Sequence, residues 1–116
     1  MTINEMIEMK EFARGLGYTI SDNDCVDHRK FTVRYPNSSI YSTILDFTYE
    51  NCNYVNFDES SVESLIPGNL HRNKRKTFFV SELNKDAVQN FLVQRWKDYK
   101  DYIEAIKLNN IESDFN

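Results

Sequence analysis

Hydrophobic residues recur every three or four positions near the start of the chain, which is the spacing of one face of an α-helix. Thr2 lies just before the first apolar residue of this stripe, and Glu5 follows three residues later. This is the spacing of a capping box, in which each side chain hydrogen-bonds the other residue's backbone. Gly15 and Gly17 follow the stripe, and either glycine suits the left-handed residue that ends a helix. The pattern predicts a helix over about residues 3–14. Its apolar positions are Ile3, Met6, Ile7 and Ala13.

A longer stripe with the same period occupies the last third of the chain. Leu83 and Val88 flank Asn84 at the spacing of a hydrophobic staple around an N-cap. The pattern predicts a long amphipathic helix over about residues 85–107, one end of which projects beyond a small sheet. Residues 109–116 show no period and are expected to form a flexible tail, which leaves 1–108 as a single domain. The stripe consists of Val88, Leu92, Trp96, Tyr99, Ile103 and Ile106.

Between the two helices the apolar period changes to two, which is typical of half-buried strands. In 30–35 the alternation directs Phe31, Val33 and Tyr35 inward. In 41–49 the odd-numbered residues share one face, and Ile44 is expected on the other face with Ser42, Asp46 and Thr48. Further strands are predicted at 18–21, 54–57 and 77–80, with a polar turn at 22–29. Short connections favour antiparallel pairing, so the predicted fold class is α+β, with an antiparallel sheet of four to five strands flanked by the two helices.

Composition agrees with one globular domain. The 116 residues are 41% hydrophobic and 14% aromatic, which supplies a core rich in large rings. No apolar run reaches the roughly 18 residues of a membrane span, and the first ten residues do not have the pattern of a signal peptide. Two cysteines in such a chain are expected to be free thiols, and a cytoplasmic location follows.

The formal net charge of -4 is unevenly distributed. Residues 1–66 hold 5 cations and 11 acids, whereas residues 67–116 hold 9 cations and 7 acids. Four cations fall within residues 71–76, and a nucleic acid or nucleoprotein could bind this basic run. The alternative is a solubilising turn, since charge runs are commonly solvated. The candidate basic residues are Arg72, Lys74, Arg75 and Lys76.

Acidic residues gather in the turn at 22–29 and just beyond the strand at 54–57. A row of carboxylates at the edge of a sheet can imitate phosphates and occupy the basic surface of a nucleic-acid-binding protein. Here too a simpler interpretation exists, because an acidic surface keeps a small protein in solution. The candidate acidic residues are Asp22, Asp24, Asp27, Asp58 and Glu59.

Catalytic and metal-binding patterns are weak. Cys25 and His28 have ligand-like spacing and could join Cys52 and His71 in a zinc site, but the second pair lacks that spacing. A calcium loop beginning at residue 22 fails because it lacks the glycine and the glutamate that such a loop requires. No cofactor motif is present, and the expectation is a protein that is not an enzyme and needs no cofactor.

The order helix, strands, long helix, together with an acidic, Asn- and Tyr-rich composition and the start Thr2-Ile3-Asn4-Glu5, resembles in general character the small proteins that phages and mobile elements use against host defences, anti-CRISPR proteins among them. This resemblance implies a non-catalytic inhibitor that occupies a nucleic-acid-binding surface of a host defence nuclease complex. It carries no functional residue across to this chain.

Three hypotheses therefore follow from the sequence. The first is a protein-binding inhibitor that presents the acidic residues to a basic target. The alternative is a small nucleic-acid or nucleoprotein binding module that uses the run at 71–76. A third is self-association through exposed rings of the long helix, Tyr99 or Tyr102, and the oligomeric state is left open.

Overall fold

The computed structural model describes residues 1–36, 43–58 and 75–115, with the side chains of the last helix described as far as residue 105. The elements in chain order are α1 (Ile3–Leu16), β1 (Thr19–Asp24), β2 (Arg29–Arg34), β3 (Thr43–Tyr49), β4 (Tyr54–Asp58), β5 (Arg75–Phe79), a short 3-10 turn (Val80–Glu82) and α2 (Lys85–Phe115).

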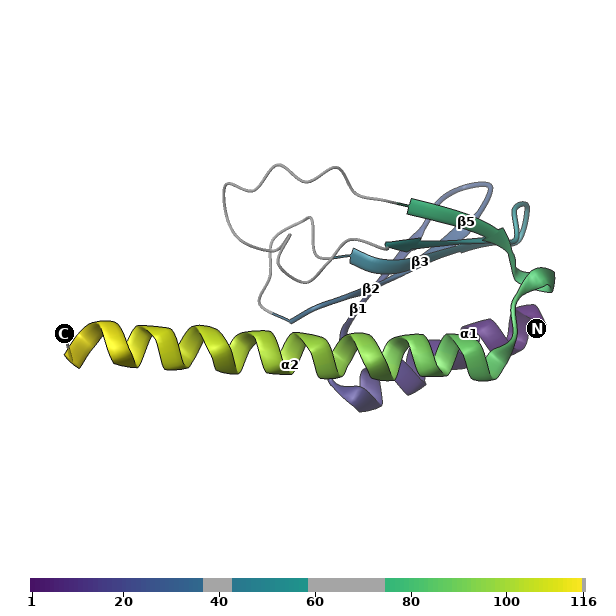
Figure 1. Cartoon of the computed structure of the whole chain (residues 1–116). Coiled ribbons are helices and arrows are strands. Elements are labelled where there is room, and N and C mark those ends of the chain that lie inside the picture. Colours follow the sequence, from purple (N-terminus) through teal and green to yellow (C-terminus); the bar gives the residue numbers. More distant parts are fainter. Residues whose placement is uncertain (37–42, 59–74, 116) are drawn as a thin grey trace.

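The five strands form one antiparallel sheet in the order β1-β2-β3-β4-β5, so every strand pairs with its neighbour in sequence. Both helices lie on the same side of this sheet, and the two chain ends lie at opposite ends of the molecule (Figure 1). The predicted fold class, α+β with an antiparallel sheet and a long C-terminal helix, is confirmed.

The start of α1 follows the sequence prediction. Thr2 accepts a hydrogen bond from the backbone N–H of Glu5, and the Glu5 carboxylate accepts one from the backbone N–H of Thr2. These reciprocal bonds satisfy two donors that a helix N-terminus would otherwise leave unpaired, and they lower the pKa of Glu5. The helix runs to Leu16, two residues further than predicted, and Gly17 ends it.

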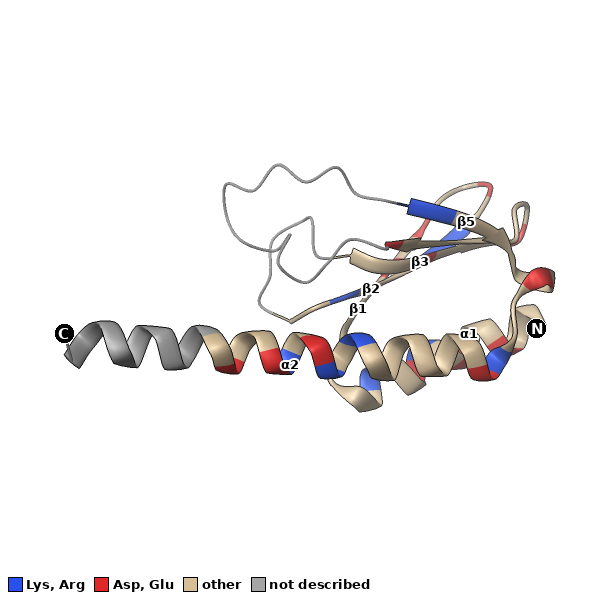
Figure 2. Ribbon diagram, in the orientation of Figure 1, with Lys and Arg blue, Asp and Glu red and all other residues tan. Residues whose placement is uncertain are grey.

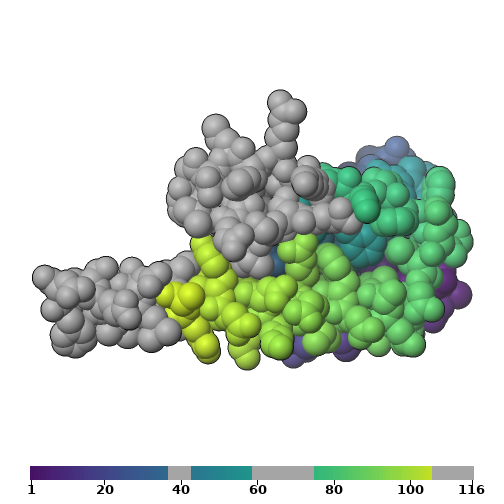
Figure 3. Space-filling view, in the orientation of Figure 1, coloured from purple at the N-terminus to yellow at the C-terminus, as the bar shows by residue number. Residues whose placement is uncertain are grey.

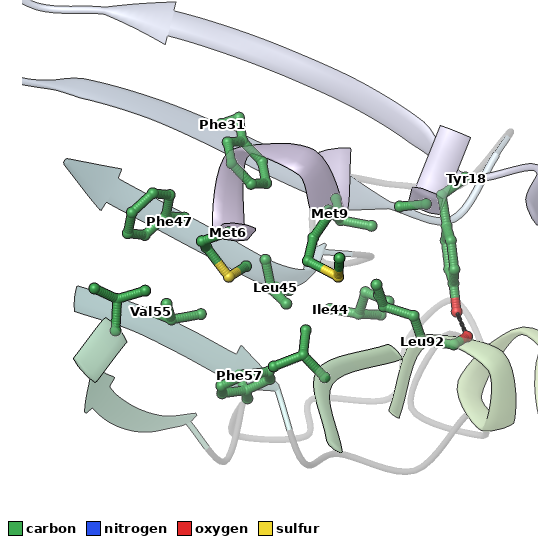
Figure 4. Close-up of a cluster of buried hydrophobic side chains, with 14 of the residues drawn as sticks. Met6, Met9, Tyr18, Phe31, Ile44, Leu45, Phe47, Val55, Phe57 and Leu92 are labelled. Atoms are coloured by element: carbon green, nitrogen blue, oxygen red, sulfur yellow. Dashed lines mark hydrogen bonds between the residues drawn. The ribbon is translucent and has the colours of Figure 1, made fainter. Parts of the chain in front are cut away.

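The core lies between the helices and one face of the sheet. Phe31 and Val33 of β2 face Leu45 and Phe47 of β3, as the alternation predicted. The expected position of Ile44 on the opposite face is wrong. Arg34 pairs with Thr43 and Val33 with Leu45, so Ile44 is the extra residue of a β-bulge and packs in the core with its neighbour. Figure 4 shows the core cluster, which includes Met6 and Met9 from α1 and Leu92 from α2.

Helix α2 begins as predicted, because the Asn84 side chain accepts hydrogen bonds from the backbone N–H groups of Asp86 and Ala87 at 2.9 and 3.2 Å. It continues to Phe115, so the predicted end near residue 107 is wrong. Its 31 residues correspond to a length of about 46 Å, and the helix extends beyond the sheet (Figure 1). The flexibility expected of 109–116 stays a prediction.

A cluster of rings attaches α2 to the end of β2 and the start of β1. Trp96 packs edge-on against Tyr18 with ring centroids 4.9 Å apart, and Tyr99 stacks on Tyr35 at 4.5 Å. The buried Tyr18 hydroxyl donates to the backbone carbonyl of Leu92 at 2.7 Å. Burial raises the pKa of Tyr18 far above its ordinary value and raises the pKa of Tyr35 to about 12. The middle of α2 is therefore fixed to the sheet by aromatic packing and a buried hydrogen bond.

Two segments differ from the predicted boundaries. Strand β1 continues to Asp24, so Asp22 and Asp24 belong to a strand, and the predicted turn at 22–29 shrinks to the residues before Arg29. Strand β5 begins at Arg75, so the last two cations of the basic run are strand residues. Both segments are polar edge strands whose backbone hydrogen bonds to a partner strand override their weak sequence signal.

Candidate binding surface

The sheet has one face covered by the helices and a second face over which no described helix or strand lies. In an antiparallel sheet, directly paired residues point to the same side, so the register assigns each residue to a face. Since Phe31, Phe47 and Val55 face the core, the residues between them in each strand face outward. We call this set the open face. It carries Thr19, Ser21, Asn23, Lys30, Thr32, Arg34, Thr43, Asp46, Thr48, Tyr54, Asn56, Asp58, Arg75, Thr77 and Phe79.

A hydrogen-bonded row crosses the middle of the open face. Thr77 of β5 donates from its hydroxyl to the Asn56 side-chain carbonyl, and Asn56 donates from Nδ2 to Asp46 Oδ1 at 3.0 Å. The Lys30 ammonium lies 4.0 Å from Asp46 Oδ2. Asp46 is only 3% exposed, so this carboxylate is held by Asn56 and Lys30 and offers little negative surface to a partner.

Two aromatic residues lie in the next row. Tyr54 of β4 pairs directly with Phe79 of β5, and both fall on the open face because Thr48, the partner of Tyr54 on β3, points away from the core. Phe79 is 64% exposed, whereas its neighbour Phe78 turns inward and packs edge-on against Phe57. Phe79 therefore gains little of the hydrophobic stabilisation that burial would give a phenylalanine, and together with Tyr54 it makes a two-ring row on this face.

The more accessible charges on the open face are positive. Arg75 is exposed, and Lys30 and Arg34 are partly exposed, whereas the acids of this face are the buried Asp46 and the partly buried Asp58. Figure 2 shows cations on β2 and β5, with most acids on the helices and at the turns. This face is therefore locally less acidic than a chain of net charge -4 would suggest.

The predicted acidic residues do not form one row. Asp22 points to the helix side and pairs with Lys10 of α1 at 2.8 Å. Asp24 and Asp27 are exposed at the β1–β2 turn, where the His28 side chain hydrogen-bonds Asp27 at 2.8 Å and lowers the pKa of its carboxyl. Asp58 lies at the other end of the sheet beside Arg75, and its backbone carbonyl accepts from Arg95 at 2.9 Å. Glu59 lies outside the described residues.

The predicted basic run is divided by the sheet. Arg75 pairs with Asp58 and belongs to the open face, whereas Lys76 pairs with Phe57 and belongs to the helix side. Arg72 and Lys74 lie outside the described residues. Arg75 thus joins Lys30 and Arg34, two cations from β2 that the sequence analysis did not single out.

Other sequence hypotheses also change. Among the described residues, His, Cys, Asp and Glu side chains form no group of three that could hold a metal ion, and Cys25 and Cys52 are exposed free thiols. His71 lies outside the described residues. Tyr99 does not offer a free ring for self-association, because it stacks on Tyr35 and its hydroxyl donates to the Pro36 carbonyl at 3.0 Å. In the space-filling view, the described part of α2 forms one long side of the molecule (Figure 3).

Comparison of the chain with protein-family models, curated proteins and solved structures finds no significant match. The class of the protein is therefore defined by its fold, a five-stranded antiparallel sheet with two helices on one face. Within the described ranges, neither helix combines the length and the apolar character that crossing a bilayer requires.

Proposed function

We propose that this protein acts by binding, without catalysis or a cofactor, and that the open face contacts an anionic macromolecule, either nucleic acid or nucleoprotein. The observation that supports this proposal is the charge on that face: Arg75 is exposed and Lys30 and Arg34 are partly exposed, while Asp46 is buried and held by Asn56 and Lys30, and Asp58 is partly buried. This is the alternative function predicted from the sequence, but with different binding residues. The cations now proposed to bind lie on β2 and β5 and not only in the run at 71–76.

The energetics favour a modest, salt-dependent interaction. Each phosphate contact from an accessible cation releases condensed counterions, and this release supplies most of the non-specific affinity for nucleic acid. Three cations are few, and the overall charge of -4 opposes association at long range. The expected affinity is therefore weak unless other groups on the face contribute.

A charge-removal experiment tests this function. Binding of a fluorescent oligonucleotide is measured by anisotropy at low salt for the wild type and for the Arg34→Gln/Arg75→Gln variant. The matched control is Lys97→Gln/Lys100→Gln, which removes the same charge from exposed positions on α2. We expect the open-face variant to lose about tenfold in affinity or more and the control to change by less than about twofold. Equal losses would show that net charge, and not the open face, governs binding.

A second function is favoured by a different part of the molecule. At the β1–β2 turn Val26 is 109% exposed between the exposed Asp24 and Asp27. The side chain of Asn51, in the β3–β4 turn, donates a hydrogen bond to the backbone carbonyl of Asp27 and so helps to hold the β1–β2 turn in place. An acidic tip with an apolar centre could enter a basic protein surface, as a cytoplasmic anti-CRISPR-like inhibitor of a host defence nuclease complex would require.

The test of this second function uses charge reversal at the tip. Tagged wild type and Asp24→Lys/Asp27→Lys are incubated with a nuclease-treated bacterial lysate carrying defence systems. A nuclease protein retained by the wild type and lost from the variant would support the inhibitor function. Equal retention by both proteins would show that Asp24 and Asp27 do not contribute to binding.

A further inference from the structure

We propose that the open face prefers single-stranded to double-stranded nucleic acid, with unpaired bases stacking on Tyr54 and Phe79. This inference rests on the proposed function and names the ligand class that the same face would take. The two rings lie on the same face as the cations, and phosphate contacts alone would not use them.

Phe79 is exposed where a base could reach it, and Tyr54 beside it is half-buried. Tyr54 and Phe79 are direct partners on neighbouring strands, so their Cβ atoms lie about 5 Å apart and their side chains rise from the same face. Strand β5 is at the edge of the sheet, and Phe79 is 64% exposed there. Among the large hydrophobic side chains that stand exposed in the described part of the chain, Phe79 is the one aromatic residue.

Two cations lie on the same face as the rings, one across the strands from them and one along β5. Lys30 shares the cross-strand row of Tyr54, since both pair with Thr48 of β3, and two strand spacings separate them by about 10 Å. Arg75 lies four residues from Phe79 along β5, which corresponds to about 13 Å. A backbone could therefore contact cations while its bases lie on the rings, which is the usual combination in single-strand binding proteins.

The middle of the face suits the same ligand. The Thr77–Asn56–Asp46 row presents hydroxyl and amide groups, and its one carboxylate is buried and held, so it does not repel phosphates at the surface. A duplex keeps its bases stacked on each other and offers only its backbone to a flat face. The rings would then gain nothing from duplex, and affinity should favour the single strand.

An acidic protein segment is the competing occupant, because it too would meet the cations. It would use Phe79 as an apolar contact and not as a stacking platform. Replacing Phe79 by leucine keeps apolar area and removes the ring, whereas replacing it by tyrosine keeps the ring. The two substitutions therefore separate stacking from general apolar contact.

The experiment measures the affinities of wild type, Phe79→Leu, Phe79→Tyr and a Tyr102→Ala control on α2. The probes are an oligothymidine of about 12 nucleotides, a duplex of the same length and polyglutamate. We expect the wild type to bind oligothymidine more tightly than duplex. Phe79→Leu should lower oligothymidine affinity at least about fivefold and leave duplex binding unchanged, with Phe79→Tyr and Tyr102→Ala within about twofold of the wild type.

The inference is overturned if Phe79→Leu binds oligothymidine like the wild type, if duplex binds as tightly as the single strand, or if polyglutamate binds as tightly as oligothymidine. Each of these results leaves the proposed function intact provided that Arg34→Gln/Arg75→Gln still weakens binding. If the wild type binds none of the three probes, both proposals fail together.

Discussion

At residue 17 the backbone has a φ of 124°, in the region that favours glycine, and a Cβ atom built there would lie 2.5 Å from Cζ2 of Trp96. Gly17→Ala should therefore displace the indole as well as strain the helix cap, and we expect a loss of about 2 kcal/mol in the free energy of unfolding. Gly15→Ala is the matched control, because nothing lies within 4 Å of its Cβ position. Gly15→Ala should raise the free energy of unfolding, measured in urea, by about 0.5–1 kcal/mol, because alanine favours the helix more than glycine does. Equal effects at the two positions would contradict the close contact with Trp96.

Tyr35 gives a prediction for alkaline pH. Its pKa is raised by burial from 10.0 to about 12, so the unfolded chain loses the phenolic proton at a lower pH than the folded protein. Keeping this phenol protonated therefore stabilises the folded protein fully below pH 10, the unfolded pKa. As the pH rises from there through the folded pKa, the free energy of unfolding falls by about 1.4 kcal/mol per pH unit. Urea unfolding measured between pH 9 and 11, at about one-unit steps, should show that the free energy of unfolding falls less for Tyr35→Phe than for the wild type. Parallel curves for the two proteins would show that Tyr35 ionises normally.

At the scale of elements, the start of α2 can be tested through its cap. Asn84 accepts two backbone hydrogen bonds there, so Asn84→Ala should cost about 1 kcal/mol in the free energy of unfolding. Asn90→Ala, an exposed position within the same helix, should be neutral or slightly stabilising because alanine has the higher helix propensity. Urea denaturation of the two variants checks the pair. A loss at Asn90 as large as that at Asn84 would mean that the side-chain cap contributes nothing.

The elements that the sequence predicted well are those whose own periodicity is strong. The caps at Thr2 and Asn84 and the alternation around Phe31 are local signals, and each one appears in the structure. The edge strands β1 and β5 were predicted short because their polar residues acquire strand structure only through pairing. The bulge at Ile44 depends on the register with β2, which no local pattern contains.

At the scale of the whole molecule, the residues of the proposed binding surface could not be grouped from the sequence either. From the sequence, Arg75 was a candidate within the basic run that precedes the strand predicted at 77–80. Lys30, Arg34, Tyr54 and Phe79 were not predicted to form a group with it. The signal that could have found them was the face opposite the core residues of each strand. That signal becomes useful only once the order and register of all five strands are known.

The small number of cations on the open face predicts the salt dependence of binding. Contacts from Lys30, Arg34 and Arg75 to a single strand should give a slope of about -2 in a plot of log affinity against log salt concentration. Arg34→Gln/Arg75→Gln should make the slope shallower, at about -0.7, because one of the three cations remains. Anisotropy titrations at several salt concentrations measure both values. A wild-type slope that the double substitution leaves unchanged would assign the contacts to other cations.

The open face of the sheet is the proposed contact surface. The most direct test is to map backbone amide shifts by NMR while the whole protein is titrated with oligothymidine. We expect the largest shifts on β2, β4 and β5 around Arg34, Tyr54 and Phe79, with α2 and the β1–β2 turn little changed. Shifts concentrated on α2 or at Asp24 and Asp27, or no shifts at all, would contradict it.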